Sequence, residues 1–444
     1  MAQMRSADRV RKRPMPGEDR TYDGHHESDA NDPKRRCRNS LLDHSVRPVM
    51  TTTLHETLYV IGEDGMTKPL DRRTFLGGSA VAAGSALTCT AMVRTAAGEV
   101  VPRIEAPLVD KLLIRVVVDG AHDIFIPEQK VPDIAVAQAR MQGGEKFRRT
   151  LQSEWGLSLH LTSQKAAESR RYLLDFAYTP DVLNNNLELL EIDLPAIDGM
   201  ILSHGHLDHW GGLPGFLEKH RAAMRPDLPL YLGGEDAFCR RVSRGPGGVI
   251  SPFGTLDRKE LAAAGLRLVV SEAPQVIDGH AFTTGVVPRK SIERVLPNSQ
   301  VVFGVTDGAG CDPARYGDHH FTEAELSGQP QPDQHLHEHG TCFNVRGRGL
   351  VVITSCGHGG IINTIRRAKE VSGVEKVYAL VGGFHLAPAP ADYLAKIMAE
   401  LKTLDVEHIF PMHCSGSNFL ELAKREMPQA LVLCTTGSQF TFAA

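Results

Sequence analysis

The stretch Ser203-His204-Gly205-His206-Leu207-Asp208-His209-Trp210-Gly211-Gly212 follows a short apolar run and places four potential metal ligands within six residues. Alternate side chains of an extended segment point the same way, so His204 and His206 can reach one ion. Asp208 and His209 lie on the next turn, where they can reach a second ion. The pattern H-x-H-x-D-H after a predicted strand therefore indicates a metal centre. A chance cluster of surface histidines is the alternative.

The composition of the whole chain is that of an ordinary globular protein. Its 444 residues, 42% hydrophobic and 23% charged, are enough for two or three domains. The formal net charge of −4 creates no field that would attract nucleic acid, and this argues against a nuclease. No apolar stretch is both long enough and hydrophobic enough to predict a membrane-spanning segment. We therefore expect a small-molecule substrate as the partner, while the sequence carries no signal for an oligomeric state.

Cysteines and histidines are distributed differently along the chain. The eight cysteines are scattered without a C-x-x-C pair, which is the pattern of neither a disulfide framework nor a zinc ribbon. Fourteen of the 20 histidines lie from His204 onward. The metal chemistry is therefore expected in the C-terminal part.

The N-terminal hundred residues differ in character from the remainder. Residues 1–65 are polar, carry basic clusters and lack periodicity, so we expect no packed core there. A nuclear-localisation or nucleic-acid-binding arm is an alternative that the interspersed acidic residues disfavour. Residues 71–87 combine a twin arginine, Phe75-Leu76 and an Ala/Gly-rich run, and they resemble a bacterial twin-arginine export signal. A plain small-residue helix is the alternative reading.

The signal peptide is expected to span residues 66–97, because Thr95-Ala96-Ala97 supplies small residues before a cleavage point at Gly98. Since such a signal belongs at the N-terminus, Met66 is predicted to be the true initiator and residues 1–65 a mis-annotated extension. The mature protein would then be periplasmic or secreted, with no stable membrane span after cleavage. This export route carries folded proteins, so the metal would be acquired in the cytoplasm.

Residues 105–444 are predicted to form one α/β domain. β-branched or alternating runs predict strands at 111–119, 156–162, 171–175, 199–202, 228–232, 266–270, 350–354, 377–381, 408–410 and 431–433. Helical patterns cover 181–190, 213–224, 361–371, 393–404 and 419–425. Residues 306–340 lack periodicity, so the segment 240–340 is expected to be a loop-rich insert or lid. Strands with helices packed outside them imply a layered architecture.

Potential ligands follow several of the predicted strands. They are Asp175, the 204–209 motif, Cys356, His358, His385 and His413. In layered α/β folds, sites collect at the carboxyl ends of strands. These side chains are therefore expected to converge.

With these features the chain resembles the metallo-β-lactamase superfamily. Within it, the chain is most similar to the 7,8-dihydropterin-6-yl-methyl-4-(β-D-ribofuranosyl)aminobenzene 5'-phosphate synthase-like branch. The resemblance extends over residues 110–440 and rests on the segments 155–158, 203–213, 285–289, 355–364, 382–386 and 411–416. It implies a four-layer αββα sandwich with one or two metal ions between its sheets.

The resemblance also implies a set of metal ligands. In chain order they are His204, His206, Asp208, His209, His358 and His413. The first two, completed by His358, match one metal site, and the other three match a second. Many members place a bridging aspartate where this chain has Cys356. Cys356 is therefore a possible thiolate ligand, with a small buried residue as the alternative.

Imidazole and carboxylate ligands suit Zn²⁺, with Mn²⁺ or Fe²⁺ as alternatives. A metal with an open position lowers the pKa of its bound water to about 7, and two ions roughly 3.5–4 Å apart can share the hydroxide. The expected reaction is hydrolysis of a small ester, lactone or phosphoester. Asp208 is expected to orient the nucleophile. His385 is expected to bind substrate or protonate the leaving group, and a supporting or core histidine is the alternative.

Three further groups are candidates for other roles. Arg289 can bind an anionic substrate group, because guanidinium suits phosphate and carboxylate, but a surface salt bridge explains it equally well. His335, His337 and His339 form a dense patch on the expected lid. Alternate histidines can bind a metal, yet a solvated loop is the favoured expectation. The same expectation applies to residues 318–320.

Hydrolysis is the leading functional hypothesis. The synthase-like activity is the main alternative. It ranks below hydrolysis because an exported enzyme would not meet its cytoplasmic substrate. A non-catalytic metal- or ligand-binding module on the same fold is the alternative of another class, and the intact motif at 204–209 disfavours it. Di-iron oxidoreductases of the superfamily usually have Glu in place of His206, which disfavours redox chemistry. The branch resemblance points away from a β-lactamase.

Overall fold

The computed structural model describes residues 103–139, 149–296, 298–316, 319 and 321–444, together with two short strands nearer the N-terminus. The chain divides into two compact units, Met1–Val93 and Arg94–Ala444. In the first unit, β1 (Tyr59–Ile61) and β2 (Thr67–Pro69) pair antiparallel. Apart from these strands, the expected extension 1–65 and signal peptide 66–97 lie outside the described residues.

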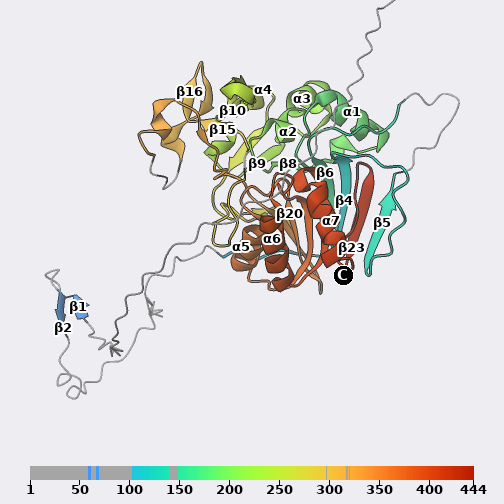
Figure 1. Cartoon of the computed structure of the whole chain (residues 1–444). Helices are drawn as coiled ribbons and strands as arrows, with labels where there is room; N and C mark the ends of the chain where they lie inside the picture. Colours follow the sequence, from blue (N-terminus) through green and yellow to red (C-terminus); the bar gives the residue numbers. More distant parts are fainter. Residues whose placement is uncertain are drawn as a thin grey trace, which may run out of the picture. The chain divides into compact units, whose positions relative to one another are not determined.

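The second unit is built on two large sheets (Figure 1). The first has eight strands, in spatial order β12 (Arg267–Val270), β9 (Pro229–Leu232), β8 (Gly199–Leu202), β7 (Glu168–Leu174), β6 (Ser158–Lys165), β4 (Lys111–Val118), β23 (Ser438–Ala443) and β5 (Ile134–Gln138). The strands β7, β8, β9 and β12 run parallel to one another. The carboxyl end of β8, which leads into the H-x-H-x-D-H motif, therefore lies beside the end of β7.

The second sheet has seven strands. Their order is β13 (Val276–Ile277), β14 (Ala281–Thr283), β19 (Thr341–Val345), β20 (Gly349–Thr354), β21 (Val377–Gly383) and β22 (Val406–Met412), with β3 (Leu108–Val109) also paired to β19. The strands β20, β21 and β22 are parallel neighbours. Their carboxyl ends, which precede Cys356, His385 and His413, therefore lie side by side.

Side chains on the two faces of a central strand pack into different cores. Ile201 of β8 packs between the sheets with Phe343 and Val381 of the second sheet. Its neighbours Met200 and Leu202 pack on the opposite face, in a cluster that includes residues of several helices. Both faces are buried, which explains why the strand reads as a continuous apolar run.

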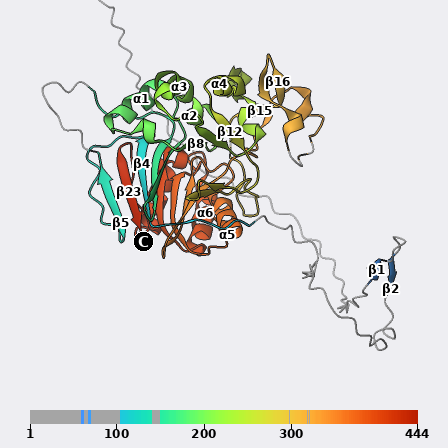
Figure 2. The same cartoon turned by 180° about the vertical axis from the view of Figure 1, so that it is seen from behind.

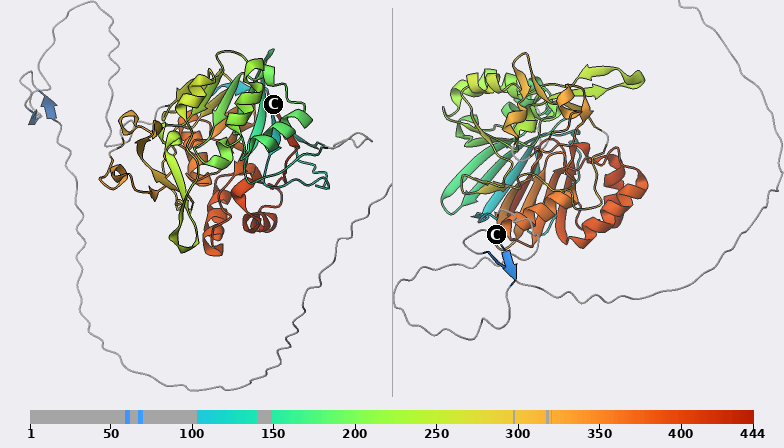
Figure 3. Two further views of the ribbon diagram at one scale, coloured as in Figure 1. Left: turned by 90° about the horizontal axis from the view of Figure 1, so that it is seen from above. Right: turned by 90° about the vertical axis from the view of Figure 1, so that its left-hand side faces the viewer.

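Helices cover the outer face of each sheet (Figures 2 and 3). The helices α1 (Pro180–Leu189) and α3 (Leu213–His220) pack on the first sheet. The helices α5 (Ile361–Ser372), α6 (Ala391–Thr403) and α7 (Ser417–Glu426) pack on the second. In α5, Ile361, Ile365 and Ala368 are buried at helical spacing, as an amphipathic helix requires. This arrangement confirms the expected α/β sandwich.

The expected loop-rich segment 240–340 contains several short elements. β10 (Arg240–Arg244), β11 (Ile250–Pro252), β15 (Gln300–Val302) and β18 (Gln331–Pro332) form a small antiparallel sheet. β16 (Gly304–Thr306) and β17 (Ala309–Cys311) form a hairpin, and α4 (Arg258–Ala263) lies near β10 in the chain. A disulfide joins Cys239 to Cys311, 72 residues apart. The scattered cysteine pattern did not indicate this disulfide, because local spacing carries no information about partners so distant in sequence.

Most expected elements agree with the structure to within a few residues. The strand expected at 431–433 is wrong, because there Leu431 forms an isolated bridge to Ile409. The C-terminal strand β23 was not expected, although Phe440 and Phe442 alternate and are buried. In the described part of the chain, no helix combines the length and apolar character needed to cross a membrane.

Candidate metal centre

The H-x-H-x-D-H motif is anchored by a buried carboxylate that follows β7. Asp175 has a left-handed backbone, with φ of 59°. Its Oδ1 accepts the backbone N–H of Ser203 at 2.8 Å, and its Oδ2 accepts the Ser203 hydroxyl at 2.7 Å. Oδ2 also lies 2.7 Å from Nδ1 of His209. Asp175 therefore orients His209 from behind, which leaves the opposite ring nitrogen directed elsewhere.

A first group of donors forms around His204 and His358. Ligand atoms of His204, Cys356 and His358 all lie within 4.8 Å of one another. The ring of His206 is centred 4.8 Å from those of both His204 and His358. Nε2 of His204 and both ring nitrogens of His358 are buried and have no hydrogen-bond partner in the described part of the chain. Buried imidazole nitrogens without partners are costly, so their convergence fits the binding of a cation.

A second group forms where the short helix α2 (Leu207–Trp210) faces the turn after β22. The Oδ2 atom of Asp208 lies 3.3 Å from Nε2 of His413. The Nε2 atoms of His209 and His413 are 3.2 Å apart. Ligand atoms of His209, His413 and Cys356 also lie within 4.8 Å of one another. Cys356 therefore belongs to both groups of donors.

The charges around the two groups differ. Burial lowers the pKa of His204, His206 and His358 well below the usual value, and the neighbouring histidines lower it further. Burial also lowers the pKa of His209, but the carboxylates of Asp208 and Asp175 outweigh this effect and raise it to about 9. The first group therefore offers neutral imidazoles and the second offers the carboxylate of Asp208, and divalent transition metals use both kinds of ligand.

His385 follows β21 and lies within the same cluster. Its ring centroid is 4.1 Å from that of His358, and its Nδ1 is 3.6 Å from Sγ of Cys356. His385 and His413 both have positive φ, at 46° and 49°, which non-glycine residues rarely adopt. Backbone hydrogen bonds hold these turns: His385 N–H donates to Sγ of Cys414, and His413 N–H donates to Asp119.

The expectation of a solvated loop at residues 335–339 is wrong. His335, His337 and His339 are each no more than 3% exposed. His335 stacks on His358 at 3.8 Å between ring centroids, and it forms a further possible ligand group with His206 and His358. His337 accepts the backbone N–H of Gly205 at 2.7 Å, which fixes the turn inside the motif. Tertiary contacts bury these side chains, and both ring nitrogens of His335 have no hydrogen-bond partner in the described part of the chain. A polar run without periodicity gives no sign of such burial.

Glu338 supports the loop that carries His358. Its two carboxylate oxygens accept the backbone N–H groups of Gly357 and Gly359, at 2.9 and 2.5 Å. The sequence shows that histidines alternate with this carboxylate. It does not show that these side chains point into the protein.

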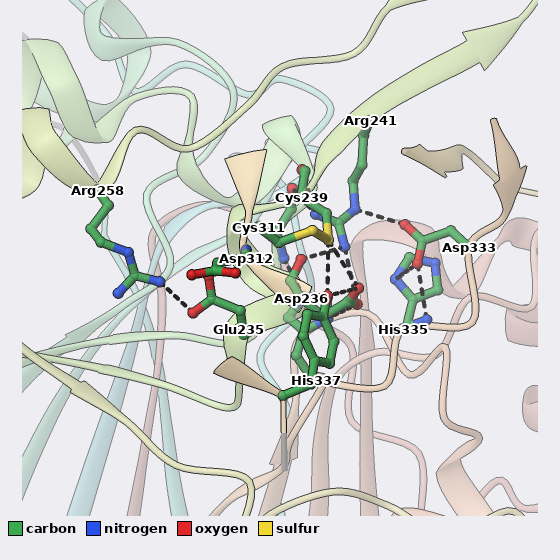
Figure 4. The surroundings of a disulfide bond; sticks show 12 residues. Glu235, Asp236, Cys239, Arg241, Arg258, Cys311, Asp312, Asp333, His335 and His337 are labelled. Atoms are coloured by element: carbon green, nitrogen blue, oxygen red, sulfur yellow. Dashed lines mark hydrogen bonds and ion pairs between the residues drawn. A yellow bond between two sulfur atoms is a disulfide. The ribbon is translucent and has the colours of Figure 1, made fainter. Parts of the chain in front are cut away.

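A buried ionic network around Arg241 reaches His206 through Ser299. Figure 4 shows its part at Arg241, Asp236 and Asp333. Oγ of Ser299 lies 2.7 Å from Nε2 of His206 and donates to Asp333 at 3.3 Å. The fully buried Arg241 donates to Asp333 at 2.7 Å and to Asp236 at 3.3 Å. Asp236 also contacts His337. No spacing in the sequence indicated these partners, because they come from separate elements.

Two other candidates have their partners within the 240–340 segment. Arg289 is partly buried, and its guanidinium donates to the backbone carbonyl of Gln334. His319 lies 3.5 Å from a carboxylate oxygen of Glu325 and packs against Phe321. Asp318 and His320 lie outside the described residues.

A cavity of about 460 Å³ borders the second donor group. His413 and Asp119 line it together with the apolar residues Ile126, Trp155, Met412, Leu420 and Leu433. The indole of Trp155 lies 4.9 Å from the ring of His413 and is 55% exposed, so it borders both the cavity and the solvent. The volume falls in the range of small-molecule sites.

Two facing sheets, with potential metal ligands at the carboxyl ends of their strands, define the class of fold. The model of the metallo-β-lactamase superfamily matches residues 166–310, and the chain carries a domain of this superfamily. The matched segment contains the H-x-H-x-D-H motif, while His358, His385 and His413 follow it.

Two proteins from Methanocaldococcus jannaschii are similar in sequence to this chain. The chain is 27% identical over 267 residues to 7,8-dihydropterin-6-methyl-4-(beta-D-ribofuranosyl)-aminobenzene-5'-phosphate synthase, covering 60% of this chain and 82% of that protein. It is also 27% identical over 250 residues to the uncharacterized protein MJ0448, covering 56% of this chain and 80% of that protein.

Among solved structures, Tm1679, a metal-dependent hydrolase of the beta-lactamase superfamily, shares the fold. Its TM-score is 0.51 at 22% identity, covering 74% of this chain and 98% of that chain.

Proposed function

We propose that the protein is a metal-dependent hydrolase acting on a small ester, lactone or phosphoester. The observation that carries this proposal is the convergence of buried nitrogens of His204 and His358, which have no hydrogen-bond partner among the described residues, with the sulfur of Cys356. The same sulfur lies within 4.8 Å of ligand atoms of His209 and His413, and His413 lines a cavity of small-molecule size. Burial makes the nitrogens of His204 and His358 poor proton acceptors and good ligands for a cation.

The proposed first site consists of His204, His206 and His358. The proposed second site consists of Asp208, His209 and His413. Cys356 lies within reach of both groups and is proposed as a shared thiolate ligand. Zn²⁺ suits this mixture of imidazole, carboxylate and thiolate, with Mn²⁺ and Fe²⁺ as alternatives. When bound, such a metal supplies a Lewis acid and lowers the pKa of a coordinated water.

The residues around the proposed sites supply the remaining requirements of hydrolysis. Oδ1 of Asp208 is buried without a hydrogen-bond partner among the described residues, so it can orient an attacking water. His385, next to His358, is proposed to donate a proton to the leaving group. The apolar wall formed by Trp155 and Leu420 is proposed to hold the organic part of the substrate. Arg289 is proposed to bind an anionic substrate group from the side of the 333–339 segment.

The synthase-like activity is the second candidate, and the 27% identity to the archaeal synthase favours it. A non-catalytic metal-binding module is the third, from another class. All three use the same donors, so the metal content does not separate them, whereas turnover does.

The test is to measure metal content and turnover on the same full-length preparations. Zinc stoichiometry is determined after purification without added metal. Hydrolysis is then followed with 4-nitrophenyl acetate, dihydrocoumarin and bis(4-nitrophenyl) phosphate. Synthase activity is followed by the formation of 7,8-dihydropterin-6-methyl-4-(beta-D-ribofuranosyl)-aminobenzene-5'-phosphate, the compound in the name of the archaeal relative. His206→Ala is expected to lose both zinc and turnover. His220→Ala, at a half-buried position at the end of α3, is the matched control. Equal turnover by wild type and His206→Ala would contradict the proposal.

We also propose that the enzyme is exported by the twin-arginine route and acts in the periplasm or outside the cell. The Cys239–Cys311 disulfide supports this proposal, since disulfides persist in oxidising compartments. N-terminal sequencing of the precursor and of the exported protein tests it. The precursor is expected to begin at Met66 and the exported form near Gly98. A precursor peptide from residues 20–60 would contradict the start at Met66.

A further inference from the structure

Two cysteines meet at the centre of the donor cluster, although 58 residues separate them in the chain. Cys356 follows β20 and Cys414 follows β22, and their sulfur atoms are 3.2 Å apart. Both side chains are buried, at 2% and 1% exposure. Because β20 and β22 are both held in the second sheet with β21 between them, the two turns are fixed relative to each other.

The surroundings hold the sulfur of Cys414 in this position. The backbone N–H of His385 donates to Sγ of Cys414 at 3.1 Å, from the end of the intervening strand β21. The same sulfur lies 3.4 Å from the carbonyl oxygen of Cys356. A disulfide has an S–S length of about 2.05 Å, so closing the pair requires a movement of only about 1 Å.

We infer that Cys356 and Cys414 are a redox pair, which peroxide converts to a disulfide when the metal centre is empty and which bound metal protects. In the first step, hydrogen peroxide oxidises one thiol to a sulfenic acid and releases water. In the second step, the other thiol attacks the sulfenic sulfur, forms the S–S bond and releases a second water. Together the two thiols lose two protons and two electrons, and one peroxide is reduced to two waters.

The link to the metal centre comes from the position of Cys356. Its sulfur is within 4.8 Å of donors in both proposed sites, while Cys414 is adjacent to His413 in the chain. A sulfur engaged in a disulfide has no thiolate to offer to a metal. Conversely, a metal that binds Cys356 occupies the electron pair that would attack the oxidant. Oxidation and metal binding therefore exclude each other at this atom.

This pair is separate from the other cysteines that the structure describes. The Cys239–Cys311 disulfide joins the residue before β10 to the end of β17. Cys342 lies within β19, and the sulfur of Cys434 lies 3.4 Å from the carbonyl oxygen of Pro411. Cys434 therefore serves as a control thiol for oxidation.

The test uses full-length protein, once stripped of metal by a chelator and once loaded with Zn²⁺. Each sample is treated with hydrogen peroxide, the remaining thiols are alkylated, and the peptides are mapped by mass spectrometry without reduction. The metal-free protein is expected to yield a peptide pair cross-linked between Cys356 and Cys414. Zinc is expected to reduce its yield about tenfold. The oxidised protein is expected to bind zinc at least about tenfold more weakly than the reduced protein.

Two variants sharpen the result. Cys414→Ser removes the partner thiol and is expected to leave Cys356 as a sulfenic acid that dimedone traps. Cys434→Ser is expected to leave the cross-link unchanged. Alkylated thiols or separate sulfinic acids at Cys356 and Cys414 in metal-free wild type would overturn the pair. Equal cross-linking with and without zinc would overturn its link to the metal.

The inference rests on the proposed metal centre and is independent of the substrate. A negative hydrolysis panel with an intact, zinc-sensitive cross-link would reject the proposed hydrolase alone. Normal zinc binding and hydrolysis without the cross-link would reject only the redox pair.

Discussion

The imidazole ring of His335 lies flat against that of His358, with centroids 3.8 Å apart and planes inclined by 13°. The two residues come from different parts of the fold, His335 from the 240–340 segment and His358 from the turn after β20. Neither ring nitrogen of His358 has a hydrogen-bond partner in the described part of the chain, so stacking restricts a side chain that the protein otherwise leaves free for a ligand.

Replacing His335 by alanine is therefore expected to weaken zinc binding about tenfold. The mutation removes both the stacking partner of His358 and a donor close to His206. Competition with a chromophoric chelator measures the change. His319→Ala, elsewhere on the same segment, is the control and is expected to bind zinc normally. Unchanged affinity in His335→Ala would show that the stack has no part in the metal centre.

The Asp175→Asn variant tests how the motif is held. The carboxylate accepts from Ser203 and contacts Nδ1 of His209, so the amide leaves at least one of these contacts poorly matched. We expect zinc affinity to fall about tenfold to 100-fold, with the thermal unfolding temperature less affected. Asp227→Asn, at an exposed position, controls for a general effect of charge. Wild-type zinc affinity in Asp175→Asn would show that Asp175 does not orient His209.

Trp155 is expected to act on substrate binding more than on the chemical step. Its indole lines the cavity and faces the ring of His413. Trp155→Ala removes this wall, and KM is expected to rise about tenfold while kcat changes less. Trp155→Phe keeps an aromatic surface and is expected to recover most of the loss. A fall in kcat at constant KM would contradict the proposed role of the cavity.

Glu293 is expected to make the stability of the protein depend on pH. Burial raises the pKa of its carboxyl to about 7, although hydrogen bonds from the first turn of α5 oppose this shift. Its usual value is about 4.3, so between about pH 4 and 7 the folded state binds more protons than the unfolded state. This contribution to stability is complete below the lower value and is lost as the pH rises through the upper one. The loss is on the order of 3 kcal/mol.

Chemical denaturation of wild type and Glu293→Gln at pH 5 and pH 8 measures this effect. The glutamine keeps the shape of the side chain and does not ionise. The free energy of unfolding of the variant, relative to wild type, is expected to be higher at pH 8 than at pH 5. Parallel pH profiles for the two proteins would show that Glu293 does not titrate differently in the folded state.

The agreement between sequence and structure is best where local signals coincide with the architecture. The strand 199–202 reads as an apolar run because both of its faces are buried, and its carboxyl end places the motif correctly. The same reasoning applies to Val351 and Val381, whose strands lead to His358 and His385. In this C-terminal part of the chain, strands and helices alternate regularly, and this alternation leaves few ways to arrange them.

The parts of the fold and of the site that the sequence does not predict depend on contacts between distant segments, which local patterns do not reveal. His335 lies in a polar run, and its ring packs against those of His206 and His358 only after the chain has folded. Arg241 carries a full charge into the interior, where Asp236 and Asp333 compensate it from separate elements. Hydrophobic periodicity predicts neither arrangement, because the relevant free energy is that of pairing charges and hydrogen bonds across the fold.

The donors come from both sheets, and this has a consequence for synthesis. The H-x-H-x-D-H motif follows β8 of the first sheet, whereas Cys356, His358 and His413 follow strands of the second. A chain emerging from the ribosome exposes its first four ligands well before β20 and β22 exist. Neither proposed metal site has all of its ligands until the chain has been translated beyond β20, because the first needs His358 and the second needs His413. Metal retention then reports completion of the whole domain, and a chain truncated before β20 would carry the motif without the means to keep an ion.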